Sequence, residues 1–128
     1  MKTLSIIAAL SLTACIDVPE PDGKQAFMEN CASCHGFDAK GTGEMADILI
    51  KMPPDLTTLT QRNGGVFPTV YVMSTIDGYS RKDHFSGAMP EFGAAGLGET
   101  VIVEKDGIGT PVPAELLALT EYLEGVQR

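Results

Sequence analysis

The sequence has little of what a catalytic centre built from acids, bases and nucleophiles needs. Only two of the 128 residues are histidine and only three are cysteine. The 17 Asp and Glu residues are scattered, so no local pair of carboxylates is placed for general acid–base catalysis. No Ser, His and Asp are grouped in the pattern of a hydrolase. We therefore do not expect the chain to be an enzyme in its own right.

Positive charge is also scarce, and the N-terminal apolar run is short. Nine Lys and Arg residues stand against 17 acidic ones, a formal net charge of −8 at pH 7. A phosphate backbone would repel such a chain, which excludes nucleic acid as a partner, whereas a basic patch of another protein would attract it. The run Leu4–Leu12 is too short for a transmembrane helix, which needs about 20 residues.

One pentapeptide carries a distinctive chemical pattern, Cys31-Ala32-Ser33-Cys34-His35. This C-x-x-C-H sequence is the attachment pattern of a c-type haem. Two thiols three residues apart can each add to a vinyl group on one porphyrin edge, and the following histidine is then carried beneath the iron as the proximal ligand. A redox dithiol would need a βαβ context, and a zinc site would need more ligands than the isolated Cys15 and His84 supply. A plain disulfide would leave His35 without a role.

The first 21 residues have the pattern of an export signal and a tether. Residues 1–14 contain one cation, an apolar run and then small residues, which is typical of a secretory signal peptide. Leu12-Thr13-Ala14-Cys15 resembles the lipobox of bacterial lipoproteins, which implies cleavage before Cys15 and acylation of its thiol. Residues 15–21, broken by two prolines, are then a lipid anchor and tether. Ordinary cleavage near Ala14 is the alternative.

A single domain is predicted over residues 22–128. Its first helix begins at Asp22, a good N-cap residue, and places Gly23, Phe27 and Cys31, four residues apart, on one face. Together with the C-x-x-C-H sequence, this arrangement resembles the class I c-type cytochromes. In that family the first helix carries a glycine and an aromatic residue at these offsets before the first cysteine.

The C-terminal end of the chain agrees with this resemblance. A helix is predicted over residues 114–125, with an apolar stripe at helical spacing formed by Leu116, Leu119, Leu123 and Val126. In the family, two positions on this helix cross the N-terminal helix, which implies that Leu119 and Tyr122 contact its glycine and its aromatic residue. The resemblance implies an all-α cytochrome c fold, with crossing terminal helices and short helices around one haem c.

The middle of the chain is less specific. Apolar residues at helical spacing predict short helices over residues 44–51, 57–61 and 67–76. Residues 94–113 depart from a minimal class I cytochrome. Their β-prone Val-Ile-Val run and the Asp-Gly turn signal that follows predict a small β-hairpin near residues 100–110. It could shield a haem edge, contact a partner or be an insertion without a role.

The resemblance also supplies a candidate for the second axial ligand. In the family a methionine well downstream of the haem motif, often followed by proline, binds the iron through sulfur. Met89 fits this description, while Met73, within a predicted helix, and His84, on the same loop, are the alternatives. A proline carbonyl in the family also accepts the N–H of the proximal histidine, which implies this role for Pro53 or Pro54.

An iron with two protein ligands has no open position for a substrate, so the resemblance implies outer-sphere electron transfer. We expect an electron carrier on the periplasmic side of a bacterial membrane, held there by its N-terminal lipid and docking with redox partner proteins through charged surface. A permanent cytochrome subunit of a larger oxidoreductase is the first alternative. A haem-based sensor or ligand-binding protein with an open distal position is the second.

Overall fold

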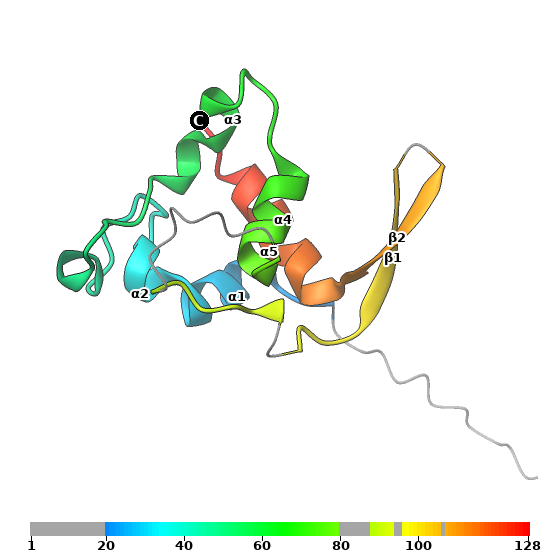
Figure 1. Cartoon of the computed structure of the whole chain (residues 1–128), viewed down its shortest axis with the longest axis horizontal. Coiled ribbons are helices and arrows are strands. Elements are labelled where there is room, and N and C mark those ends of the chain that lie inside the picture. Colours follow the sequence, from blue (N-terminus) through cyan, green and yellow to red (C-terminus); the bar gives the residue numbers. More distant parts are fainter. Residues whose placement is uncertain (1–19, 80–87, 94–95, 106) are drawn as a thin grey trace, which may run out of the picture.

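The computed structural model describes residues 20–79, 88–93, 96–105 and 107–128, and Figure 1 shows the arrangement of their elements. The predicted signal peptide, Cys15 and His84 lie outside these residues. The described chain is mostly helical, with one two-stranded antiparallel sheet. In chain order its elements are α1 (Gly23–Asn30), α2 (Ala32–His35), η1 (Ala46–Ile48), η2 (Leu56–Thr58), α3 (Leu59–Arg62), α4 (Thr69–Asp77), β1 (Thr100–Lys105), β2 (Ile108–Pro113) and α5 (Ala114–Gly125), where η marks a 3-10 helix.

Helix α1 starts where the sequence predicts. The Asp22 carboxylate accepts hydrogen bonds from the backbone N–H groups of Lys24 and Gln25, at 2.9 and 3.1 Å, which satisfies two of the free donors of the first turn. The helix ends one residue before the haem motif, because Cys31 leaves helical geometry with φ of −120° and ψ of −34°. A separate short helix, α2, then carries the rest of the motif.

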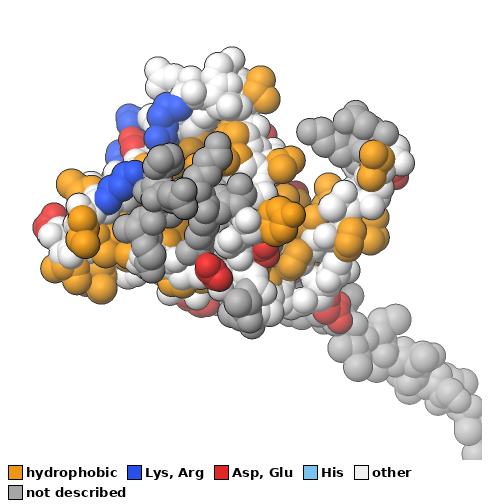
Figure 2. Space-filling model, viewed as in Figure 1, with side chains coloured by type: hydrophobic (Ala, Val, Ile, Leu, Met, Phe, Trp, Pro, Cys, Tyr) orange, Lys and Arg blue, Asp and Glu red, His pale blue; other side chains and the backbone are white. Residues whose placement is uncertain are grey.

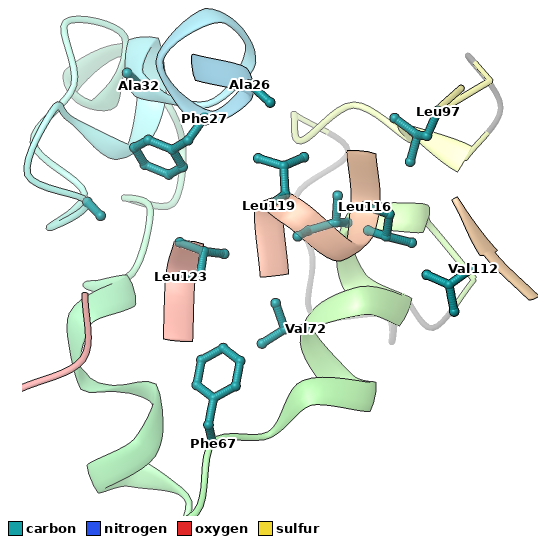
Figure 3. Packing of buried hydrophobic residues seen from close by; sticks show 12 residues of the cluster. Ala26, Phe27, Ala32, Phe67, Val72, Leu97, Val112, Leu116, Leu119 and Leu123 are labelled. Atoms are coloured by element: carbon teal, nitrogen blue, oxygen red, sulfur yellow. The ribbon is translucent and has the colours of Figure 1, made fainter. Parts of the chain in front are cut away.

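Helix α1 packs against α5. A Cβ atom on Gly23 would overlap the carbonyl oxygen of Ala118, so the two backbones are in direct contact there. Further along, the rings of Phe27 and Tyr122 lie 5.3 Å apart between centroids, tilted by 45°. Leu119 is only 1% exposed. Figure 3 shows the core around this contact, in which α1, α4 and α5 supply Phe27, Val72, Leu116, Leu119 and Leu123.

The predicted hairpin is present, so the fold is not purely helical. Strands β1 and β2 pair antiparallel from Thr100 opposite Pro113 to Lys105 opposite Ile108, and they project beside α5 in Figure 1. Val112 is buried against the core, whereas the side chain of Ile102 is 68% exposed. The hairpin therefore rests on the body by one face and leaves apolar side chains of the other face uncovered.

The helix predicted over residues 44–51 is wrong, because only the 3-10 turn η1 forms there. Its apolar side chains have no surface to pack against: Ile48 is 73% exposed. The backbone N–H groups of Gly43 and Met45 instead donate to carbonyls of the haem motif. Because a short helix is stabilised mainly by packing of its apolar face, this segment keeps only a 3-10 turn.

The helix predicted over residues 67–76 forms as α4, two residues later, and ends at Gly78 with φ of +97°. Its buried face consists of Val72, Thr75 and Ile76, on the helix that packs against α5. Val70 is exposed, so the apolar stripe that the spacing suggested is rotated relative to the face that the fold buries. The short helix predicted over residues 57–61 forms as η2 and α3.

Candidate functional site

The haem motif is held by backbone hydrogen bonds from the loop that follows it. A helix of four residues cannot stabilise itself, because nucleation costs more than so few hydrogen bonds return. In α2 the carbonyls of three consecutive residues each accept an N–H from alternate residues of the loop. The bonds run to Ser33 from Met45 at 2.9 Å, to Cys34 from Gly43 at 3.2 Å and to His35 from Gly41 at 2.7 Å. The loop therefore fixes the turn that carries Cys34 and His35.

Both cysteines of the motif are free thiols. Burial raises the pKa of Cys31 to about 11, with smaller contributions from Cys34 and from Glu115 at the start of α5. Reactive dithiols have lowered pKa values instead, so this environment opposes the redox-dithiol alternative. Among the described residues, no group of three or more His, Cys, Asp and Glu could hold a metal ion. Both thiols are therefore available to form a covalent bond to another group.

The imidazole of His35 lies in a half-buried position. Its Nδ1 is buried and makes no hydrogen bond within the described part of the chain. Burial lowers the pKa of His35, and the nearby Pro54 carbonyl acts in the opposite direction. An unpaired buried nitrogen costs free energy, and a hydrogen-bond acceptor close to the ring would remove that cost. A ring held by such an acceptor through one nitrogen has its other nitrogen available to ligate a haem iron.

Pro53 and Pro54, the two prolines predicted to lie near His35, make different contacts. The Pro53 carbonyl packs against Gly41, where an added Cβ would overlap its oxygen. The Pro54 carbonyl lies close enough to favour a protonated His35, although it does not meet the geometry of a hydrogen bond. Pro54 is therefore the residue that we expect to accept the ring N–H.

Met89 lies in a non-helical segment anchored on the end of α4. The backbone N–H of Phe92 donates to the carbonyl of Ile76 at 3.2 Å, and Glu91 packs against Gly78. Met89 and Met73 are both partly buried against the hydrophobic core. The second axial ligand stays a prediction, with Met89 on the loop and Met73 inside α4.

Apolar side chains are exposed next to the motif. Figure 2 shows hydrophobic side chains gathered at the lower left of the molecule, over the segment around η1. In the chain segment around η1, Ile48, Ile50 and Met52 are largely exposed. Exposed apolar surface of this kind is typical of a place where another apolar body lies. A flat porphyrin or a partner surface would cover it.

Comparisons with known proteins point to one family. The family model described as Cytochrome c matches residues 21–127. The cbb3-type cytochrome c oxidase subunit CcoP of Rhodobacter capsulatus is 44% identical over 62 residues, which are 41% of this chain and 21% of that protein. The subunit FixP of Sinorhizobium medicae is 55% identical over 38 residues, 28% of this chain and 13% of that protein. The chain thus covers about a fifth or less of these relatives, and no solved structure matches it.

The same comparisons leave the N-terminal predictions untouched. The family match begins at residue 21, after the predicted signal peptide and tether. Within the part of the chain that the structure describes, no helix has both the length and the apolar character needed to cross a membrane. Lipidation at Cys15 therefore stays a prediction.

Proposed function

Because this chain belongs to the cytochrome c family, we propose that it is an electron-transfer protein with one haem c bound covalently through Cys31 and Cys34. The observation that carries the proposal is the braced α2 turn: the N–H groups of Cys34 and His35 donate to the Cys31 carbonyl, and the following loop fixes Cys34 and His35. When bound, the haem supplies an iron that accepts and donates one electron. The chain's own work is to hold the ligands still and to keep water away from the site.

We propose His35 as the proximal ligand and Met89 as the distal one. The half-buried imidazole of His35, whose pKa is lowered by burial, supports the first assignment. The partly buried position of Met89, on a segment anchored to α4, supports the second. A His/Met pair favours the ferrous iron and gives a high reduction potential, which suits a carrier that delivers electrons to an oxidant. The close contact at Gly23 supports the further proposal that α1 and α5 cross, as in class I cytochromes.

We also propose that the domain of residues 22–128 works on the periplasmic side of a bacterial membrane. Residues 1–14 are the signal peptide in this proposal, and Cys15 carries the lipid at the end of a tether formed by residues 15–21. The net charge of −8 supports docking on basic surfaces of redox partners. A second candidate is a fixed subunit of a larger oxidoreductase, which the similarity to two cbb3-type oxidase subunits favours.

The haem proposal is tested on the purified full chain. We expect mass spectrometry to show the mass of one haem added to the polypeptide, and the haem to stay attached on a denaturing gel. The double variant Cys31→Ala with Cys34→Ala should lose this attachment, whereas Cys15→Ala, the matched control, should keep it. Covalent haem in the double variant would refute the attachment site.

Two further observations separate the candidate functions. A reduced protein that does not bind carbon monoxide supports two protein ligands and electron transfer, because both axial positions are then filled. Ready carbon monoxide binding would favour an open distal site. Purification from membranes as a stable complex with other oxidoreductase subunits, instead of as a free protein, would favour the fixed-subunit candidate.

A further inference from the structure

A dense polar cluster joins the last two residues of the chain to the segment after Pro54. The Arg128 guanidinium donates to the Asp55 carboxylate at 2.8 Å and to the Thr57 hydroxyl at 2.9 Å. Beside it, the Gln127 amide donates to the Leu56 carbonyl at 2.8 Å. The same amide accepts the N–H of Thr60 at 2.9 Å. The side chains of Gln127 and Arg128 thus form hydrogen bonds along the segment of residues 55–60.

Residues 53–56 also contact the 39–41 loop, which is hydrogen-bonded to the haem motif. The N–H of Leu56 donates to the Ala39 carbonyl at 2.8 Å. The Pro53 carbonyl packs on Gly41, and the N–H of Gly41 donates to the His35 carbonyl at 2.7 Å. Pro54 lies between these two attachments. A continuous set of contacts therefore runs from Arg128 and Gln127 to the residues around His35.

We propose that Gln127 and Arg128 are positioning residues for the haem: they hold residues 55–57 against the 39–41 loop and so keep the Pro54 carbonyl beside the His35 ring. This inference rests on the proposed function, because it assigns His35 to the iron. The alternative is that Arg128 and Asp55 form an ordinary surface ion pair. The Arg128 side chain is 61% exposed, and such a pair alone contributes little.

The two alternatives predict shifts of opposite sign in the reduction potential. A carbonyl that accepts the ring N–H makes the imidazole more electron-donating and favours ferric iron, so a carbonyl that moves away raises the potential. Loss of a cation alone also favours the ferric state, which lowers the potential. A positioning role therefore reveals itself by a rise when Arg128 loses its charge.

The test is a redox titration of the haem-loaded full chain, followed by its visible spectrum. Arg128→Gln is compared with Lys24→Gln, which removes an exposed cation on α1, outside the 39–41 loop and the cluster. Gln127→Ala, which leaves the charge unchanged, is compared with Gln25→Ala, which removes an exposed hydrogen bond to Glu29 on α1. We expect both cluster variants to shift the equilibrium toward the reduced form at least threefold, or about 28 mV for one electron.

The controls and a second readout decide the outcome. We expect Gln25→Ala to leave the potential unchanged, Lys24→Gln to lower it slightly and Arg128→Lys to restore most of the wild-type value. Amide hydrogen exchange of Leu56, measured by NMR on the reduced protein, should accelerate in both cluster variants. Cluster variants that match their controls in potential would overturn the proposal, and so would a shift in potential without faster exchange. Wild-type protein without covalent haem would instead refute the proposed function itself.

Discussion

Gly23→Ala tests the contact between α1 and α5, on which the core depends. The added methyl group would overlap the carbonyl oxygen of Ala118 and would lie 3.0 Å from the amide nitrogen of Leu119. Both are backbone atoms that cannot rotate away, so the helices must separate. Overpacking of this kind costs about 1–3 kcal/mol, and we take the upper end because backbone meets backbone. Alanine returns up to about 1 kcal/mol through helix propensity, so the net loss should be about 2 kcal/mol.

Guanidinium denaturation of the ferric protein, followed by far-UV circular dichroism, measures this loss. A loss of that size also lowers the thermal midpoint by about 9 °C, given an unfolding entropy of about 2.1 cal/mol/K per residue. Gly125→Ala is the matched control, because nothing lies within 4 Å of a Cβ at that position in the last turn of α5. It should leave the stability unchanged or raise it by up to about 1 kcal/mol. Equal stabilities of the two variants would refute the close backbone contact.

Three further predictions concern the core, the anchor and the polar cluster. Leu119→Ala should lower the free energy of unfolding by about 2–5 kcal/mol in the same assay, since this side chain is fully buried; a loss near zero would contradict its place in the core. Cys15→Ser should release the protein from membranes on fractionation, and unchanged retention would argue against lipidation. The hydrogen bond from the Thr57 side chain, with smaller help from Arg128, holds the pKa of Asp55 below its ordinary value. Its contribution to stability is therefore full near neutral pH and is lost as the pH falls through the lowered pKa, so Asp55→Asn should be less stable than wild type at pH 6, and the difference should shrink in acid.

The ends of the domain could be predicted because their signals are local. Asp22 has the side chain of an N-cap, and four-residue spacing places Gly23 and Phe27 on one face. The Asp-Gly signal likewise lies between the paired strands β1 and β2, whose positions agree with the expected hairpin. In each case the signal lies within or directly beside the helix or hairpin that it predicts.

The parts that the sequence could not predict depend on contacts between distant residues. Residues 44–51 have helical spacing, but their apolar side chains find no surface to pack against, so only a 3-10 turn forms. Asp55 and Arg128 are 73 residues apart, and nothing near either one indicates the other. The cluster exists because α5 ends beside η2, which is a property of the packed domain. Sequence patterns alone therefore find the haem motif but miss the residues that we propose to position it.

The visible spectrum of the oxidised and reduced protein tests the central claim most directly, with Met89→Ala and Met73→Ala beside the wild type. We predict a low-spin c-type spectrum with the far-red band of a sulfur–iron bond in the ferric wild type. That band should vanish in Met89→Ala and persist in Met73→Ala, which removes a methionine of α4 that is also packed against the core. A wild type without the band, or a band that survives in Met89→Ala, would contradict His35/Met89 ligation and the electron-carrier function that we derive from it.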